Sequence, residues 1–362
     1  MSTPNKSTKE RKKLRIGITH GDINGIGCEL ILKTLSDARI LELFTPVLYS
    51  SPKVIAYYRK ALGLTNLNTQ TIRSAMEAND ERINVVNCLN DEVRVEMGKA
   101  TMQGGEAALS SLQSAVSEIK NEMIDALVTA PINKFNIQSE QFRFSGHTEY
   151  LKSEFGNNEA LMLMIGGTLR MGLLTGHVPL VQVPVLITQE KLISTLRLMN
   201  RTMFEDFNIN RPRIAVLSLN PHAGDNGLLG DEEQNIIIPV IEKVNNEGIL
   251  AFGPYPSDGF FGTDNYRKFD VVLAMYHDQG MTAFKTLCFE TGVNYTAGLP
   301  IVRTSPAHGT AYDLVGTNTA SPESFRQALY MACDIAANRK LYHSLKANAM
   351  KDIELKQIAG DE

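Results

Sequence analysis

The feature that most constrains the fold is the alternation of short apolar runs with longer amphipathic stretches along the chain. The runs have the length of strands, and the stretches between several of them carry apolar residues at helical spacing. Strand, helix and strand in succession require crossover connections, which give a mostly parallel sheet covered by helices on both faces. The sequence therefore predicts an α/β protein. The expected strands are Leu14–Thr19, Pro46–Tyr49, Ile83–Val86, Ala126–Thr129, Leu161–Ile165, Met171–Thr175, Arg213–Leu219 and Val271–Tyr276, and the expected helices include Gly105–Lys120, Gln189–Phe207 and Glu232–Asn246.

The division into domains is expected where this pattern is interrupted, near residues 131–144 and again near 294–304. We predict two α/β domains after a short basic tail. The tail covers residues 1–13, the first domain is discontinuous and takes residues 14–138 and 300–362, and the second domain takes residues 139–299. The tail is expected to be disordered, as chain ends usually are.

Charge and cysteine content argue against several classes of function. The 362 residues include 36 Lys and Arg against 40 Asp and Glu, so the chain lacks the positive field that binding to nucleic acid requires. The four cysteines are far apart and form no Cys-x-x-Cys pair, which argues against a zinc ribbon or a disulfide framework and fits a reducing cytoplasm. Neither a secretory signal nor a run of about 18 apolar residues is present. We expect a cytoplasmic protein that binds neither nucleic acid nor a membrane.

Three histidines occupy equivalent positions in the pattern. His177, His222 and His277 each lie just beyond an apolar strand-like run, and ligands of parallel α/β sheets bind at the carboxyl ends of strands. Three imidazoles with an open position are typical of a catalytic metal site, and Asp278 could orient the ring of His277. Alternatively, each histidine caps a turn, since no local spacing such as His-x-x-x-His is present. The repetition, in a chain with seven histidines, favours a shared metal site.

Two turns between a strand and a helix are candidate anion sites. The glycine-rich segment 20–27 follows the first strand, and amide groups at a helix start can bind an anion, although such a turn can equally be structural. A second helix is expected to open near Ser145, with Ser145 or Thr148 as its cap. His147 would then be exposed enough to donate to a phosphate or to act as an acid, and a simple helix cap is the alternative.

Three further side chains have suitable chemistry for an anionic substrate. Lys285 lies eight residues after His277, where a nearby metal would lower its pKa and make it a proton donor or acceptor. Arg303 and Asn294 flank Gly298-Leu299-Pro300, and an arginine in a loop can bind phosphate or carboxylate with two hydrogen bonds. From local sequence alone, Lys285 and Arg303 can equally be solvated charges.

Taken together, these segments resemble the 4-hydroxythreonine-4-phosphate dehydrogenase family of pyridoxal phosphate biosynthesis. The resemblance implies two α/β/α domains with a cleft between them, as in isocitrate and isopropylmalate dehydrogenases, and a homodimer with its active site at the subunit interface. Departures from the family are Ile23 and Cys28, where the family usually has proline. The matching segments, in family order and spacing, are Gly146-His147-Thr148-Glu149, Leu219-Asn220-Pro221-His222-Ala223-Gly224, Tyr276-His277-Asp278-Gln279-Gly280, Gly292-Val293-Asn294, Gly298-Leu299-Pro300 and Arg303-Thr304-Ser305.

The resemblance also implies roles for individual residues. Pro306 to Asp313 resembles the adenosine-binding loop of the isocitrate and isopropylmalate dehydrogenases, so NAD or NADP would bind there, at His308, Gly309 and Asp313. The implied ligands of a divalent metal (Zn, Mg or Co) are His177, His222 and His277, and the implied substrate-binding residues are His147, Thr148, Lys285, Asn294 and Arg303.

The expected reaction is the NAD(P)-dependent oxidation and decarboxylation of 4-phosphooxy-L-threonine to 3-amino-2-oxopropyl phosphate, in pyridoxine 5'-phosphate biosynthesis. Lys285 or His147, with Asp258, is expected to return a proton to the product. A paralogous dehydrogenase of 4-phospho-D-threonate or 4-phospho-D-erythronate is the nearest alternative. A metal-binding or phosphoester-binding protein without redox chemistry is a second alternative, in which the Pro306 to Asp313 segment would have no evident purpose.

Overall fold

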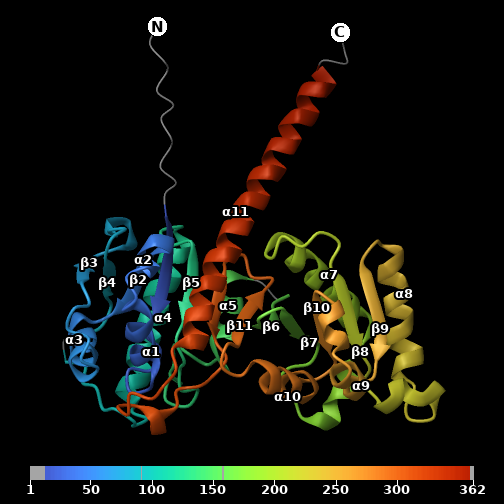
Figure 1. Ribbon diagram of the computed structural model, residues 1–362, viewed down its shortest axis with the longest axis horizontal. Coiled ribbons are helices and arrows are strands. Elements are labelled where there is room, and N and C mark those ends of the chain that lie inside the picture. Colours follow the sequence, from blue (N-terminus) through green and yellow to red (C-terminus); the bar gives the residue numbers. More distant parts are fainter. Residues whose placement is uncertain (1–12, 91, 157–158, 359–362) are drawn as a thin grey trace.

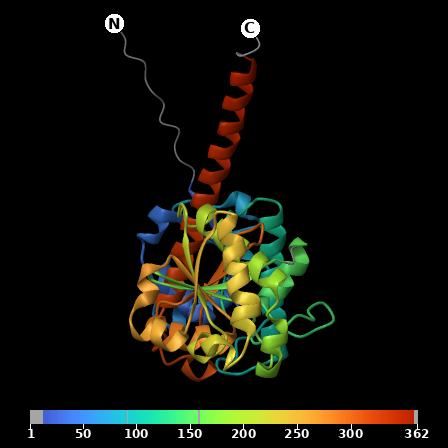
Figure 2. The ribbon, with the colours of Figure 1, turned by 90° about the vertical axis from the view of Figure 1, so that its right-hand side faces the viewer.

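A computed structural model describes residues 13–90, 92–156 and 159–358 of the chain. Within these residues a single sheet of twelve strands lies between two layers of helices (Figures 1 and 2), which confirms the predicted α/β class. The expected basic tail lies outside the described residues apart from Lys13, whose ammonium donates to the carbonyl of Leu41 at 2.8 Å.

The strands are short and mostly buried. Eight of the strands described here correspond to the expected ones, and β3, β9, β11 and β12 were not predicted. Their bounds are β1 Leu14–Thr19, β2 Phe44–Ser50, β3 Thr69–Ile72, β4 Ile83–Asn87, β5 Ala126–Thr129, β6 Leu161–Gly166, β7 Leu169–Leu173, β8 Arg213–Leu217, β9 Leu250–Tyr255, β10 Val271–Ala274, β11 Val293–Ala297 and β12 Arg303–Pro306.

Several helices begin at a side-chain cap that the sequence provides. Ser51, Thr101 and Thr188 each accept a hydrogen bond from a backbone N–H of the first helical turn. No helix in the described ranges is long and apolar enough to cross a bilayer. The helices are α1 Gly27–Leu35, α2 Ile40–Leu43, α3 Pro52–Ala61, α4 Met102–Lys120, α5 His147–Phe155, α6 Val183–Leu186, α7 Gln189–Glu205, α8 Ile238–Asn246, α9 Ser257–Gly262, α10 His277–Cys288 and α11 Glu323–Ile358.

The sheet has two mostly parallel halves joined at its centre. The strand order is β3-β4-β2-β1-β5-β12-β11-β6-β7-β10-β8-β9. The β12–β11, β11–β6 and β6–β7 pairs are antiparallel, and the other pairs are parallel. The first half therefore ends at β12, and β11 reverses the chain direction at the join.

Helices cover each half differently. In the first half α4 and α5 pack on one face through Leu112, Val116 and Leu151, while α1, α3 and α11 pack on the other. In the second half α7 and α8 continue the layer of α1 and α11, and α10 packs on the opposite face through Phe284. Figure 1 shows α11, in red, crossing the middle of the sheet and extending beyond the body of the protein.

The segment 294–304, in which the apolar pattern is interrupted, holds parts of both β11 and β12. The interruption has a physical cause, since Asn294 and Arg303 are polar residues placed on one face of these strands. The predicted boundary at residues 299/300 thus falls between two hydrogen-bonded strands. The proposed division of the chain into two domains stays a prediction, and the sheet runs on across it.

Candidate active site

A cavity of about 990 Å³ lies over the centre of the sheet, where its two halves meet. Its floor follows from the alternation of side chains along a strand. Met162 and Met164 of β6, Asn294 of β11, and Arg303 and Ser305 of β12 line the cavity, while the residues between them face α11 and the core. The walls come from α5 on one side and α10 on the other.

Two of the three predicted metal ligands meet in this cavity. The ring centroids of His177 and His277 are 5.0 Å apart, because these residues follow β7 and β10, which are neighbouring parallel strands. The Nδ1 atom of His277 is 2.7 Å from a carboxylate oxygen of Asp278, which leaves Nε2 free toward the cavity. Burial, and then the charges of Lys134 and His277, lower the pKa of His177, which favours the neutral ring.

One face of α10 contributes both His277 and Lys285. His277, Met281 and Lys285 are spaced four residues apart, so they lie along the same side of the helix, and all three line the cavity. The ammonium of Lys285 is thus placed on the same wall as the imidazole pair, one turn beyond Met281.

The opposite wall is the start of α5, which differs from the expected capping. The N-cap residue is Gly146, and neither Ser145 nor Thr148 caps the helix, so the expected side-chain cap is wrong. The first turn therefore keeps amide donors that no side chain of the cap satisfies. Burial, followed by the charges of Arg303 and Lys134, holds the pKa of His147 well below its usual range. Nε2 of His147 is buried without a hydrogen-bond partner among the described residues.

Arg303 is buried beneath this wall and has no carboxylate partner in the described part of the chain. Its Nε and Nη2 donate to the hydroxyl of Thr129 at 3.1 and 2.7 Å, and its Nη1 donates to the hydroxyl of Thr296 at 3.1 Å. Burial lowers the pKa of the guanidinium to about 10, and the negative charge of Glu149 partly opposes this effect by raising the pKa. A buried cation held only by hydroxyl groups is suited to receive an anionic ligand.

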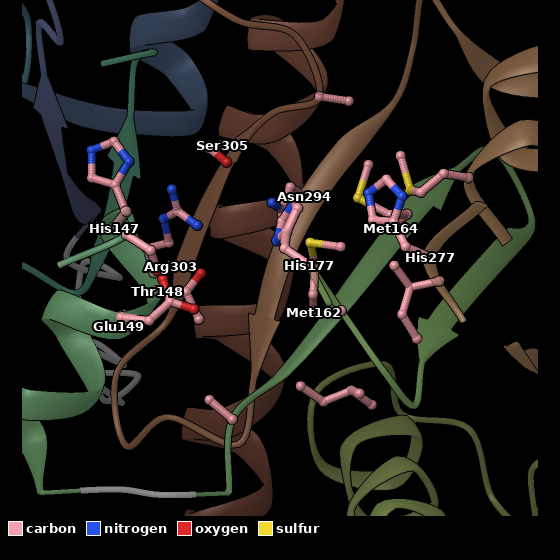
Figure 3. Close-up of a pocket in the computed structure, with 18 of the residues that line it drawn as sticks. His147, Thr148, Glu149, Met162, Met164, His177, His277, Asn294, Arg303 and Ser305 are labelled. Carbon is pink, nitrogen blue, oxygen red and sulfur yellow. The ribbon is translucent and has the colours of Figure 1, made fainter. Parts of the chain in front are cut away.

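Figure 3 shows how these groups divide the cavity. His147, Thr148, Glu149 and Arg303 lie on one side, His277 and Met164 lie on the other, and Asn294, His177 and Met162 are drawn in the middle. The amide oxygen of Asn294 is buried without a hydrogen-bond partner in the described residues. The cavity therefore combines a cationic end with an imidazole end.

Several cavity residues were missed by the sequence reasoning. Lys134, Lys152 and Lys191 line the cavity in addition to Lys285 and Arg303, and none of these three has an ion pair in the described ranges. Lys134 follows the end of β5 by five residues, and its Cε is 3.6 Å from the position of a Cβ built on Gly146. The strand-end criterion used for the histidines would have found it.

The predicted cofactor loop contacts the cavity only in part. His308 and Gly309 line it, and Nε2 of His308 is buried without a partner in the described part of the chain. Asp313 is exposed and does not line it. The base of the loop is fixed by Tyr312, whose hydroxyl donates to the buried Asp22 carboxylate at 2.7 Å.

The glycine-rich turn 20–27 is occupied by the chain itself. The N–H of Ile26 donates to the carbonyl of Thr310 at 3.0 Å, and a Cβ on Gly25 would lie 2.9 Å from the same oxygen. The turn is buried, so these contacts favour a structural role for the turn over an anion-binding site.

Two other predicted residues lie away from the cavity of the single chain. His222 is exposed on the turn after β8, and Asp258 is exposed on α9. Neither lines the cavity, and no group of three potential metal-ligating side chains occurs within the residues that the structure describes. Their predicted roles stay predictions.

The imidazole end fits a divalent cation in part. His177 and His277 offer imidazole nitrogen ligands at a separation that allows both rings to reach one ion, and Asp278 provides the outer carboxylate that ligating histidines usually have. A third ligand would have to come from outside this cavity wall. For the nicotinamide cofactor, the unpartnered nitrogen of His308 beside Gly309 is the fitting feature.

Comparison with known proteins identifies the family. The model of the family described as "Pyridoxal phosphate biosynthetic protein PdxA" matches residues 42–332. This chain belongs to the PdxA family. The match includes every residue placed in the cavity above.

Individual members of the PdxA family are similar to the chain over nearly its whole length. A 4-hydroxythreonine-4-phosphate dehydrogenase from Bacteroides thetaiotaomicron is 53% identical over 343 residues, which is 94% of each chain. One from Sulfurihydrogenibium is 40% identical over 90% of this chain and 100% of its own. The crystal structure of 4-hydroxythreonine-4-phosphate dehydrogenase from Klebsiella pneumoniae superposes with a TM-score of 0.77 at 32% identity, over 90% of this chain and 100% of its own.

Proposed function

We propose that this chain is a divalent-metal-dependent NAD(P) dehydrogenase that oxidises and decarboxylates 4-phosphooxy-L-threonine, yielding 3-amino-2-oxopropyl phosphate for pyridoxine 5'-phosphate biosynthesis. The observation that carries the proposal is the cavity, which holds both a pair of imidazoles and a buried guanidinium that has no carboxylate partner among the described residues. This arrangement suits a small molecule with an anionic group at one end and metal-binding oxygen and nitrogen atoms at the other. Membership of the PdxA family supports the same substrate.

The residues of the chain would share the work as follows. Arg303 and the free amides of the α5 N-terminus bind an anionic group of the substrate, with Thr148 and His147 beside it. Asn294 presents its unpartnered amide oxygen to the middle of the substrate. Because burial and the nearby cations hold its pKa low, the neutral ring of His147 is favoured, and a neutral imidazole can donate or accept a hydrogen bond.

Proton return to the product is assigned to Lys285. Its position on the α10 wall, beside the imidazole pair, allows it to deliver a proton to the carbon that loses carbon dioxide. Asp258 does not line the cavity of the single chain, so it could act in this step only if a second copy placed it there. Its role therefore stays a prediction.

Two bound groups supply chemistry that side chains lack. His177 and His277 together with His222 would hold a divalent cation (Zn, Mg or Co), which would supply Lewis acidity toward oxygen atoms of the substrate. His308, Gly309 and Asp313 would hold NAD or NADP, which would supply the capacity to accept a hydride.

We propose that the third ligand, His222, comes from a second copy of the chain. His222 is exposed and away from the cavity, and large apolar side chains near His177 and His222 are exposed as well. Leu180, Val181 and Val185 are 69%, 83% and 80% exposed, and Leu228 is 78% exposed. Apolar surface of this extent next to an incomplete ligand set is typical of a homodimer interface.

A panel of reactions tests the activity. The purified protein is assayed for nicotinamide reduction with 4-phosphooxy-L-threonine, 4-phospho-D-threonate and 4-phospho-D-erythronate, each with NAD and NADP, with and without a chelator. We expect the first substrate to give the highest kcat/KM and the chelator to abolish turnover. A preference for either of the other two substrates would identify the paralogous activity, and binding without any reduction would reject a dehydrogenase.

Mixing two inactive variants tests the shared site. In a mixed population of His222→Ala and His177→Ala chains, half of the dimers are mixed and carry one intact site, so about a quarter of wild-type activity should return. A mixture of His177→Ala with His277→Ala is the control. Both residues belong to the same chain's part of the site, so every site in a mixed dimer lacks one ligand. Equal recovery in both mixtures, or none in either, would contradict the arrangement.

A further inference from the structure

His222 stands at the start of a backbone turn of unusual conformation. After β8 the chain passes through Pro221, and the residues from His222 to Gly227 all have positive φ, with values of 52° at His222 and 42° at Asp225. Four of these six residues are not glycine, and L-residues avoid this region because Cβ approaches the following carbonyl oxygen. Such a turn persists only when the surrounding structure holds it in place.

The group that holds this turn is the carboxylate of Glu233. One oxygen of Glu233 accepts the backbone N–H groups of Leu219 and Asn220, both at 2.8 Å, and the other accepts the side-chain amide of Asn220 at 3.0 Å. Glu233 is 1% exposed and forms no ion pair with a cation in the described ranges. Burial of a carboxylate without a cation is unfavourable unless hydrogen bonds compensate for the loss of hydration.

The same carboxylate touches the turn from behind. A Cβ added to Gly224, in the middle of the positive-φ segment, would lie 2.7 Å from an oxygen of Glu233 and 2.8 Å from the carbonyl of Gly230. The carbonyl of Gly224 in turn accepts the N–H of Leu229 at 3.0 Å. The turn therefore wraps around Glu233, with its glycine at the closest approach. Glu233 also opens a single π-helical turn, a feature frequent at functional sites.

We propose that Glu233 is a positioning residue of the metal site, acting through the turn that carries His222. It does not contact the cation. Glu233 fixes the backbone at Leu219 and Asn220 and supports Gly224. It thereby sets the direction in which the imidazole of His222 projects from the protein surface. The inference rests on the proposed role of His222 as a metal ligand. Without the carboxylate, the strained turn relaxes toward ordinary φ values and the imidazole must be reordered each time a cation binds.

The test is Co²⁺ binding to metal-free, full-length Glu233→Gln protein, followed by titration calorimetry and by the visible absorption of the ion. The substitution keeps the size of the side chain but sets an amide donor against the amide donor of Asn220. We expect Co²⁺ affinity to fall about ten- to hundredfold, as for other outer partners of metal ligands. Saturating metal should restore kcat, with the KM for substrate unchanged.

Two further variants make this result specific. Glu242→Gln, on the exposed side of α8 and without an ion pair in the described ranges, should bind Co²⁺ like wild type. In a His222→Ala background, Glu233→Gln should cause no further loss of affinity, because the residue acts through His222. An additional loss in that background would refute the positioning role.

The outcomes separate this inference from the proposed function. If His222→Ala binds Co²⁺ normally, the proposed metal site itself is wrong. If His222→Ala loses the metal while Glu233→Gln retains full affinity, only the role of Glu233 is refuted. Should Glu233→Gln fail to fold by circular dichroism, Asn220→Ala takes its place, because it removes the side-chain hydrogen bonds to Glu233 and Glu232 and keeps the two backbone hydrogen bonds to Glu233. We expect a smaller loss of affinity in that variant, and wild-type affinity would overturn the inference.

Discussion

Replacement of Arg303 by methionine should impair catalysis severely and leave the stability of the protein nearly unchanged. Methionine is unbranched, fills a similar space and carries no charge. Arginine has five N–H donors, and three of them are engaged with Thr129 and Thr296, which leaves two for an anionic substrate.

The catalytic effect follows from these two donors. A hydrogen bond between charged groups contributes roughly 1.5 to 3 kcal/mol, so two of them contribute about 3 to 6 kcal/mol. We therefore expect kcat/KM of Arg303→Met to fall by about a hundredfold to ten-thousandfold, mainly through KM.

The stability of the protein should change little, because the cost of burying the charge and the gain from its hydrogen bonds nearly cancel. Burial that lowers the pKa of Arg303 from 12.5 to about 10 corresponds to roughly 3 kcal/mol of unfavourable free energy for the charged form. The three hydrogen bonds to the hydroxyls return about 1 kcal/mol each. Because removal of the side chain removes both contributions, the free energy of unfolding should stay within about 1 kcal/mol of wild type.

Arg339 provides a matched comparison. Its guanidinium is also largely buried, but it pairs with the buried carboxylate of Asp206 and donates to the hydroxyl of Tyr295. Arg339→Met leaves that carboxylate without its cation and should cost about 3 to 5 kcal/mol. Urea unfolding of both variants, with steady-state kinetics, measures the contrast. Equal destabilisation of the two variants, or a loss of kcat/KM below tenfold in Arg303→Met, would refute the reasoning.

Three other predictions follow from single contacts. Asp278→Asn removes the carboxylate partner of His277, so Co²⁺ affinity should fall about ten- to hundredfold in calorimetry, and unchanged affinity would exclude an orienting role. Lys285→Ala should mainly lower kcat, measured at saturating substrate, while a change confined to KM would assign it to binding instead. Burial lowers the pKa of His20 from 6.5 to about 4, so the neutral ring is favoured in the folded protein and stability is lost as pH falls from about 6.5 toward 4. His20→Gln should flatten the dependence of unfolding free energy on pH in this range, and a profile identical to wild type would contradict it.

Much of the sheet could be predicted because its strands bury both faces. β1, β2, β5 and β10 are short and largely apolar, and the structure has them where the pattern indicates. β11 and β12 could not be predicted in this way. One face of each lines the cavity, so polar residues such as Asn294 and Arg303 interrupt the apolar run that marks a strand.

The site was predictable as far as strand ends determine it. His177 and His277 follow adjacent parallel strands, so position along the chain was sufficient to bring them together. His222 also follows a strand, but the turn after β8 directs it away from the cavity. The segment Gly224-Asp225-Asn226-Gly227 favours positive φ, but this pattern does not indicate in which direction the turn points. Lys134 also follows a strand end, that of β5, and it was missed because the strand-end criterion was applied to the histidines alone.

The central antiparallel strands limit how the protein can open. β12 is bonded to β5 and β11 is bonded to β6, so backbone ladders link one half of the molecule to the other beneath the cavity. Pulling the halves apart would break these ladders, so we expect the two halves to keep their relative position when a ligand binds. The floor residues Asn294 and Arg303 would then keep their spacing. Exchange of substrate and product therefore depends on the rim of the cavity, while its base behaves as a fixed template.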